Sequence, residues 1–297
     1  MWCTSRRARV RGLLVMIKKV LIANRGEIAV RILRACHEMG IQTVAIHSVA
    51  DADAMHVRLA DESVCVGAAA PSASYLNIPN IIAACEITQA DAVHPGYGFL
   101  SENARFADIV ESHGISFIGP TAEHIRLMGD KITAKKTALE LGLPTVPGSE
   151  GAVEDVQHAH IEAERIGFPL IIKAASGGGG RGMKVVRDAD ELEDAFLTAR
   201  REAQMAFGDG AVYMERYLQK PRHIEIQVIG DGAGNAVHLG ERDCSLQRRH
   251  QKILEEAPSV CLNANEREEI GNICAKAIAT LKYRGVGTIE FLYEDGS

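Results

Sequence analysis

Strand-like apolar stretches alternate with amphipathic helical patterns through the first part of the sequence, and this alternation constrains the fold more than any other feature. The segment KKVLIANRGEIAVRILRACHEMGIQTVAIHS predicts a strand, a tight turn at Arg25-Gly26, a helix and a second strand. A strand, a helix and a strand of these lengths form a right-handed parallel unit. Because the alternation continues as far as ISFIGP, the sequence predicts an α/β fold that begins with a doubly wound parallel-sheet domain over residues 16–118.

The first turn of this domain argues against one common function of such folds. Its sequence, ANRGE, lacks the glycine fingerprint that dinucleotide-binding domains place between their first strand and helix. A nicotinamide-dependent dehydrogenase therefore has little support.

Composition is that of an ordinary globular protein and narrows the range of partners. Hydrophobic residues make up 46% of the 297 residues and charged residues 24%, and no apolar run approaches the roughly 20 residues of a membrane span. The net charge of -6 argues against nucleic acid as the main partner, since phosphate backbones require basic surface. Seven scattered cysteines without a C-x-x-C motif indicate reduced thiols and a cytoplasmic location, and disfavour a disulfide framework or a zinc site.

The first fifteen residues, MWCTSRRARVRGLLV, differ from the rest because they carry four arginines and no acidic residue. They lack the apolar stretch of a secretion signal and the serine content of a transit peptide. We therefore expect residues 1–15 to be an N-terminal extension outside the fold.

The glycine-rich run AASGGGGRGM lies between two predicted strands, GFPLIIKAAS and MKVVRD, and a long helix follows only after the second strand. Dinucleotide fingerprints and P-loops instead place a helix directly after their glycines, so that its N-terminus faces the phosphate. The run is therefore predicted to be the tip of a hairpin. Glycines let backbone N–H groups approach phosphate oxygens closely, so the tip is either a flap over phosphates or a solvated turn.

Two lysines are candidates for an anion site near this run. Lys173 lies in the apolar strand PLIIKAAS, where it either reaches water from a sheet edge or binds an anion held under the glycines. Lys131 lies in TAEHIRLMGDKITAKKTALELGLP, which is expected to be helical over residues 121–144 with Met128 packing inward. As one of three lysines in that segment, Lys131 is by default solvated surface, and nothing in the local sequence distinguishes it.

Two further segments contain candidate site residues. In MERYL, residues 214–218, a strand end combines a backbone edge, the acid Glu215 and apolar side chains, which suits a purine as well as an ordinary sheet. The segment RDCSLQRRHQK places Gln247, His250 and Lys252 in a basic cluster. On an acidic chain this cluster favours a focused pocket for phosphate or bicarbonate, with solvated surface as the alternative.

Glu290 is a single charge in the apolar strand GTIEFLY. Burying such a charge costs free energy unless the carboxylate is paired or binds a metal. Magnesium is commonly held by one or two carboxylates together with nucleotide phosphates, so Glu290 is a candidate metal ligand. The histidines show no zinc-binding spacing and no serine nucleophile motif occurs, so zinc and covalent catalysis are unsupported.

Together these motifs resemble the biotin carboxylases of the ATP-grasp superfamily. The resemblance rests on KVLIANRGEIAVRILRA, HPGYGFLSENA, FIGP, MGDK, IIKAASGGGGRGM, RHIEIQV, ERDCSLQRRHQKILEEAP and GTIEF, which occur in the family's order over residues 16–297. It implies a ligase that uses ATP and bicarbonate to form carboxyphosphate and then carboxylates biotin on a carrier protein.

The resemblance also implies roles for individual residues. The residues implied to bind ATP are Lys131, Lys173, Gly179, Gly180, Glu215, Arg216, Tyr217, Leu218, His223, Gln247 and His250. Among them, the two lysines would contact the phosphates, the two glycines would close over them, and residues 215–218 would hold the adenine. Lys252 would be catalytic and would face bicarbonate and carboxyphosphate, and Glu290 would be a carboxylate ligand of Mg²⁺ or Mn²⁺.

The family's organisation implies further boundaries. A helical connector would span residues 119–144, a lid subdomain with the glycine flap residues 145–218, and the start of the C-terminal ATP-grasp subdomain residues 219–297. The family's sequences continue beyond this point with a second metal-binding glutamate and further bicarbonate- and biotin-binding residues. The ATP-grasp fold is therefore expected to be incomplete at the C-terminus, and a protein of these 297 residues alone is expected not to catalyse carboxylation.

The implied partners are ATP, bicarbonate, a biotin carboxyl carrier protein and carboxyltransferase subunits, with a homodimer as the full-length assembly. The reaction would be the first half of acetyl-CoA carboxylase in fatty acid synthesis, and propionyl-CoA and pyruvate carboxylases have nearly indistinguishable segments. Two alternatives are another ATP-grasp ligase, such as a carbamoyl-phosphate synthase half, and a non-catalytic nucleotide-binding fragment. The motifs QRRHQK and ANRGEIA weigh against the first alternative.

Overall fold

The computed structural model describes residues 16–176, 182–248 and 251–294. The predicted site residues Gly179, Gly180 and His250 lie outside these ranges. The chain divides into two compact units, Met1–Gly119 and Pro120–Ser297, which are described separately below. None of the helices in the described ranges is both long enough and apolar enough to cross a membrane.

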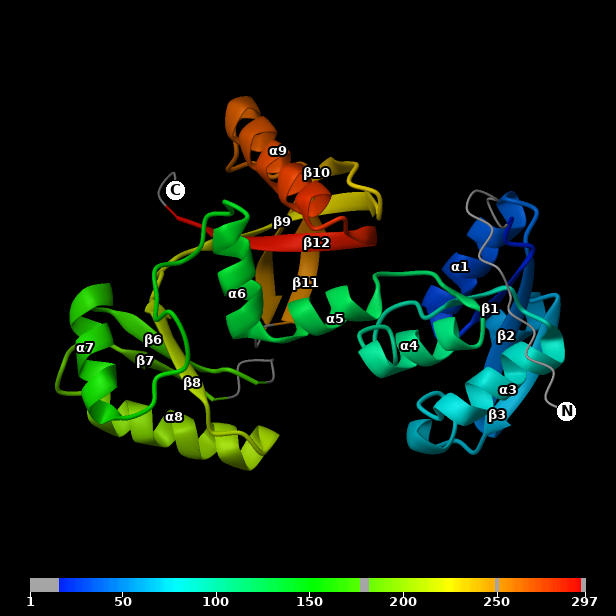
Figure 1. Ribbon diagram of the computed structural model, residues 1–297, viewed down its shortest axis with the longest axis horizontal. Coiled ribbons are helices and arrows are strands. Elements are labelled where there is room, and N and C mark those ends of the chain that lie inside the picture. Colours follow the sequence, from blue (N-terminus) through cyan, green and yellow to red (C-terminus); the bar gives the residue numbers. More distant parts are fainter. Residues whose placement is uncertain (1–15, 177–181, 249–250, 295–297) are drawn as a thin grey trace, which may run out of the picture. The chain divides into compact units, whose positions relative to one another are not determined.

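A parallel sheet forms the centre of the first unit, in the order β3-β2-β1-β4-β5 (Figure 1). Its strands are β1 (Lys19–Ile22), β2 (Gln42–Ser48), β3 (Glu62–Gly67), β4 (Ala92–His94) and β5 (Ser116–Phe117). From the central β1 the chain adds strands on one side and then returns to add strands on the other. This winding confirms the predicted doubly wound α/β fold.

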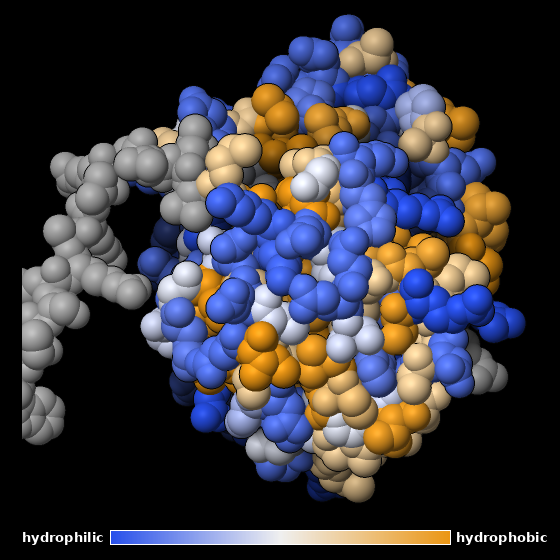
Figure 2. Space-filling model, turned by 90° about the vertical axis from the view of Figure 1, so that its right-hand side faces the viewer, coloured by the Kyte–Doolittle hydropathy of each residue, from blue (hydrophilic) through white to orange (hydrophobic). Residues whose placement is uncertain are grey.

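Helices accompany this sheet, as the alternation predicted. They are α1 (Gly26–Glu38), α2 (Met55–Leu59), α3 (Ile78–Thr88) and α4 (Ala104–Ser112), with the short 3-10 turns η1 (Val49–Asp51) and η2 (Pro71–Ala73). Ile32 and Leu33 of α1 are buried together with Val20 and Ile22 of β1, because the apolar stripe of an amphipathic helix covers the sheet. On the face of the molecule shown in Figure 2, hydrophobic side chains are interspersed with polar ones.

The second unit begins with two helices where the sequence predicted one. The helices are α5 (Ala122–Gly129) and α6 (Lys131–Glu140), so the expectation of an unbroken helix over residues 121–144 is wrong. The break falls at Asp130, whose extended backbone and side-chain carboxylate cap α6 by accepting a hydrogen bond from the Thr133 N–H at 2.7 Å. Met128 is 43% exposed, so its expected inward packing is also wrong.

A small antiparallel sheet follows, in the order β7-β6-β8, formed by β6 (Leu170–Ala174), β7 (Met183–Val186) and β8 (Val212–Arg216). The helices α7 (Val156–Ile166) and α8 (Leu192–Phe207) pack against it. β6 and β7 flank the glycine-rich run and pair directly, which confirms the hairpin expected on either side of the run. In α8 the side chains of Leu192, Phe196 and Ala199 are fully buried, as their helical spacing predicted.

The last sheet is antiparallel, in the order β11-β10-β9-β12 (Figure 1). Its strands are β9 (Arg222–Asp231), β10 (Ala236–Arg248), β11 (Gln251–Glu256) and β12 (Arg284–Tyr293). The helix α9 (Ala264–Thr280) covers one face of this sheet, where its residues Cys274 and Ile278 are buried with Ile224 and Ile226 of β9. On the other face of β9 lie Glu225 and Gln227, which alternate with these apolar residues.

Candidate nucleotide-binding site

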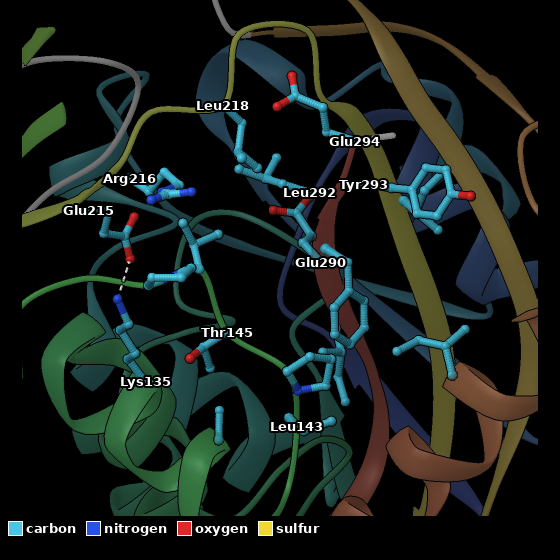
Figure 3. Close-up of a pocket in the computed structure, with 18 of the residues that line it drawn as sticks. Lys135, Leu143, Thr145, Glu215, Arg216, Leu218, Glu290, Leu292, Tyr293 and Glu294 are labelled. Atoms are coloured by element: carbon cyan, nitrogen blue, oxygen red, sulfur yellow. Dashed lines mark hydrogen bonds and ion pairs between the residues drawn. The ribbon is translucent and has the colours of Figure 1, made fainter. Parts of the chain in front are cut away.

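A cavity of about 1600 Å³ lies within the second unit. It is lined by α6, by the end of β8 and the segment after it, and by β12 (Figure 3). The predicted site residues that line it are Lys131, Glu215, Arg216, Tyr217, Leu218 and Glu290. The cavity thus brings together candidates that lie up to 159 residues apart in the sequence.

Glu215 is the most constrained charge in this cavity. It lies at the end of β8, is 8% exposed, and each of its carboxylate oxygens has its own lysine. Lys135 Nζ lies 2.8 Å from Oε1 and Lys173 Nζ lies 2.7 Å from Oε2. Burial alone would raise the pKa of Glu215, but attraction to Lys173 and the hydrogen bond from Lys135 outweigh it, so the pKa is lowered. Glu215 is therefore a charged carboxylate at neutral pH.

Lys131 adds another cation to this cluster. It precedes Lys135 by one helical turn on α6, so both side chains project from the same side of the helix. Partial desolvation and then repulsion from Lys173 lower the pKa of Lys131, while Glu215 acts in the opposite direction. Around Glu215 the three lysines outnumber the one carboxylate, and such a local surplus of positive charge attracts anions. Elsewhere the cavity is lined by four more glutamates, Glu266, Glu269, Glu290 and Glu294.

The segment after β8 forms a part of the cavity wall that is anchored by backbone hydrogen bonds. The Arg216 N–H donates to the Pro147 carbonyl at 2.8 Å, and the Tyr217 N–H donates to the Pro169 carbonyl at 3.0 Å. The Arg216 guanidinium also donates to the Ile166 carbonyl at 3.1 Å. These contacts fix the path of residues 216–217, and the nearby side chains of Leu218 and Leu292 supply apolar surface (Figure 3).

A second charged cluster connects β12 with the other three strands of its sheet. Glu290 lies directly opposite Glu225 in the pairing of β12 with β9. The Lys252 ammonium contacts both carboxylates, and Arg242 contacts Glu225 as well. Glu290 therefore has an ion-pair partner, but its side chain is 59% exposed, so the expectation of a buried charge in an apolar strand is wrong.

The carboxylate of Glu225 is charged although its residue is only 5% exposed. Burial would raise the pKa of Glu225, but hydrogen bonds from Lys252 and Arg242 lower it overall. Burial has the opposite effect on a lysine and would lower the pKa of Lys252. The hydrogen bonds to its two carboxylate partners outweigh burial, so the pKa of Lys252 is raised. Sequence reasoning missed Glu225 as a site residue. Its signal was the alternation in RHIEIQV, which places an acid on the face of β9 opposite to Ile224 and Ile226.

The remaining predicted residues lie on strands beside this cluster. Gln247 is paired with Lys252 across β10 and β11, and its side-chain amide donates to the Cys244 carbonyl at 3.0 Å. The backbone N–H of His223 donates to Ser245 Oγ at 2.9 Å. Sequence reasoning also missed Lys135, because nothing in the run of lysines distinguishes it from its neighbours.

The carboxylates present fit a divalent cation at Glu290 better than elsewhere in the cluster. The Glu290 side chain is 59% exposed, so it can exchange its contact with Lys252 for another cation. Both oxygens of Glu225 are already engaged by Arg242 and Lys252. Glu225, Cys244 and Glu255 have potential ligand atoms within 4.8 Å of one another, but burial raises the pKa of Cys244 to about 11. That thiol is protonated at neutral pH and is a poor metal ligand.

Two known protein families match successive parts of this chain. Residues 16–125 match the family described as "Biotin carboxylase, N-terminal domain", and residues 130–297 match "Carbamoyl-phosphate synthase L chain, ATP binding domain". The biotin carboxylase of Haemophilus influenzae is 60% identical over 95% of this chain. The chain belongs to the biotin carboxylase family. The predicted resemblance is confirmed, and the biotin carboxylase N-terminal domain favours it over a carbamoyl-phosphate synthase half.

Solved structures support the same biotin carboxylase fold. A biotin carboxylase complex with β,γ-ATP from Campylobacter jejuni has a TM-score of 0.89 and 53% identity, and covers 94% of this chain. The biotin carboxylase domain dimer of the Hydrogenobacter thermophilus 2-oxoglutarate carboxylase, with magnesium ADP, ADP and bicarbonate, has a TM-score of 0.88 and 48% identity over 95% of this chain. The chain spans 63% of the Haemophilus protein, 63% of the Campylobacter chain and 62% of the Hydrogenobacter chain.

Proposed function

We propose that this protein is an enzyme that uses ATP and bicarbonate to carboxylate biotin on a carrier protein. The observation that carries the proposal is the cavity lined by Lys131, Lys135 and Glu215, whose carboxylate also contacts Lys173, in a chain of the biotin carboxylase family. Similar proteins bind β,γ-ATP in one case, and magnesium ADP and bicarbonate in another, which supports the same ligands here.

ATP would bind with its adenine against residues 215–218 and its phosphates toward Lys131 and Lys173. The backbone-anchored wall after β8 and the apolar side chain of Leu218 suit a flat purine. Gly179 and Gly180 would cover the phosphates, and His223, Gln247 and His250 would complete the nucleotide contacts. Phosphoryl transfer depends mainly on positioning and on neutralising charge, which are the two things this set of side chains provides.

Glu290 would hold Mg²⁺ or Mn²⁺ together with the nucleotide. Such an ion neutralises phosphate charge and draws electron density from the phosphorus. Lys252 is the other cation at Glu290, so its ammonium is well placed to leave this carboxylate and face the anionic reactants. There it would orient bicarbonate as a bicarbonate oxygen attacks the γ-phosphorus and ADP leaves. It would then stabilise carboxyphosphate before its carboxyl group passes to N1 of biotin.

The remaining partners follow from the same proposal. The protein would work with a biotin carboxyl carrier protein and with carboxyltransferase subunits, as the first half-reaction of acetyl-CoA carboxylase in fatty acid synthesis. A homodimer is supported by the dimeric biotin carboxylase domain of Hydrogenobacter thermophilus. The six cysteines in the described part of the chain are free thiols, which supports a cytoplasmic location.

The decisive experiment combines ATP binding with turnover. Calorimetry of this chain with ATP and Mg²⁺ is expected to show binding. In the protein extended to the length of its relatives, release of ADP is expected to require bicarbonate and to increase with biotin. Lys252→Met is expected to lower turnover at least about a hundredfold while ATP affinity changes little, because Lys252 faces the reactants and not the nucleotide. A rate of ATP hydrolysis that does not change when biotin is added would contradict the proposal. ATP binding without any hydrolysis would favour a non-catalytic nucleotide-binding protein.

A further inference from the structure

Lys135 has a specific place in the cavity that the proposed roles leave unexplained. Its ammonium lies 2.8 Å from Glu215 Oε1, and its side chain is 17% exposed (Figure 3). The chain makes room for this contact at Gly148. A Cβ atom built at Gly148 would lie 2.7 Å from Lys135 Nζ and 2.4 Å from the Met214 carbonyl oxygen. Any larger residue at position 148 would therefore push against the Lys135–Glu215 pair.

The charge balance around Glu215 explains why two lysines are needed. Glu215 is buried, and a buried carboxylate that loses all of its cationic partners is strongly destabilised. Under the proposed function, Lys173 must turn from Glu215 toward a phosphate of ATP. If Lys173 were the sole partner, ATP binding would leave Glu215 as an unpaired buried charge. Lys135 contacts the other carboxylate oxygen, so it remains when Lys173 moves.

We propose that Lys135 is a positioning residue of the nucleotide site, which keeps Glu215 neutralised so that Lys173 can exchange this carboxylate for a phosphate of ATP. This inference rests on the proposed binding of ATP in the cavity. Lys135 acts through Glu215 and does not itself contact the nucleotide. Its effect therefore depends on the phosphates that attract Lys173 and not on the adenosine part of the ligand.

The test compares variants of two neighbouring lysines on one helix. Lys135→Met is expected to weaken ATP binding about tenfold or more, because part of the cost of an unpaired buried carboxylate then opposes binding. The affinity for adenosine is expected to stay within about twofold of the wild type. Lys136→Met removes the same charge from the next, exposed position and is expected to leave both affinities unchanged. Lys135→Arg keeps a cation beside Glu215 and is expected to restore most of the ATP affinity.

A double variant separates this role from a direct phosphate contact. In a Glu215→Gln background no buried charge needs a partner, so adding Lys135→Met is expected to change ATP affinity less than twofold. A persistent tenfold loss in that background would overturn the proposal, because Lys135 would then act on the phosphates directly. Equal losses for ATP and adenosine would also overturn it, because they indicate a purely structural role.

The same experiments check that each variant folds and that the wild-type protein binds ATP. Each variant's thermal unfolding is recorded, and Lys135→Gln replaces Lys135→Met if the latter is unfolded at the assay temperature. A wild-type protein that does not bind ATP would refute the proposed function itself. A wild-type protein that binds ATP, together with a Lys135→Met variant that matches Lys136→Met, would refute this inference alone.

Discussion

Tyr75, in the first unit, shows how single buried polar groups hold the fold at the scale of one residue. Its ring is fully buried, and its hydroxyl donates to Asp51 Oδ2 at 2.5 Å while accepting from the Ser48 N–H at 3.0 Å. Burial, followed by the hydrogen bond to Asp51, raises the pKa of Tyr75 to about 12. The same hydrogen bond is the main reason that the pKa of Asp51 is lowered. The hydroxyl thus satisfies the Ser48 N–H donor and the Asp51 carboxylate acceptor at the same time.

Removing this hydroxyl is expected to destabilise the first unit. Tyr75→Phe leaves the buried Ser48 N–H without its acceptor and Asp51 without its strongest donor, and we expect a loss of about 2 kcal/mol in the free energy of unfolding at pH 7. Tyr97→Phe is the matched control, because the Tyr97 hydroxyl contacts Glu27 at an exposed position, and should cost less than about 0.5 kcal/mol. Denaturant unfolding followed by circular dichroism measures both.

The sign of the pH dependence gives a second readout of the Tyr75→Phe variant. A carboxyl group with a lowered folded-state pKa stabilises the protein above its unfolded-state pKa, and this contribution is lost as the pH falls through the folded-state value. Tyr75→Phe removes the main cause of the shift at Asp51, so this acid-labile contribution shrinks. The difference between wild type and variant should therefore decrease below the ordinary carboxyl range. A difference that grows on acidification would contradict this account.

Single residues also show how far the site could be predicted from the sequence. The isolated charge in an apolar strand predicted that Glu290 is paired with a cation or binds a metal. The similar position of Lys173 predicted that its ammonium reaches water or binds an anion. The partners themselves could not be predicted, because Lys252 reaches Glu290 only through the pairing of distant strands. Glu225 and Lys135 were missed for the same reason, since their contacts are long-range. The alternation in RHIEIQV places Glu225 opposite the apolar face of its strand, but it does not reveal which residues pair with it.

At the scale of elements, sequence patterns predicted whether a segment is a helix or a strand better than they predicted the residues at which it begins and ends. The alternation of apolar residues predicted the strand pairs and α8 correctly, because burial of one face is a local periodic property. The break between α5 and α6 was missed, although Asp130 followed by Thr133 allows an N-terminal cap at that point. A helix can continue through an aspartate or restart at it. The choice depends on packing that the local sequence does not contain.

The docking of α9 depends on a buried ion pair that can be tested by substitution. Arg267 of α9 lies 2.7 Å from Glu241 of β10, whose side chain is 1% exposed, and it also donates to the Ser259 and Leu262 carbonyls. Arg267→Met leaves Glu241 charged and unpaired, so we expect a loss of about 3 kcal/mol in unfolding free energy. Lys276→Met, which removes a cation from an exposed position of the same helix, should change it by less than about 0.5 kcal/mol.

A double variant identifies the cause of the Arg267 effect. Arg267→Met combined with Glu241→Gln removes both charges, and it should recover part of the stability that Arg267→Met alone loses. Thermal and denaturant unfolding of the four proteins measure this coupling. If the two substitutions are simply additive, the buried charge is not the source of the loss, and the packing of the Arg267 side chain is.

At the scale of the whole molecule, the described residues proposed to bind the nucleotide are concentrated in one of the two units. Every described residue assigned to ATP lies beyond Gly119, whereas the first unit has its own sheet and its own core. The doubly wound arrangement of that unit was predictable, because strand–helix alternation permits few topologies. The cavity proposed to bind ATP was predicted only as a set of residues, since its walls come from helices and strands that pack over long sequence distances.

Nucleotide binding is therefore expected to stabilise the second unit selectively. A ligand present at a hundred times its dissociation constant adds about 2.7 kcal/mol to the state that binds it. ATP with Mg²⁺ should raise the unfolding temperature of the second unit by several degrees and leave that of the first nearly unchanged. Differential scanning calorimetry measures both, with Tyr75→Phe lowering the transition of the first unit and Arg267→Met that of the second. If ATP shifts the transition that Tyr75→Phe lowers, the two units unfold together or the nucleotide contacts the first unit as well.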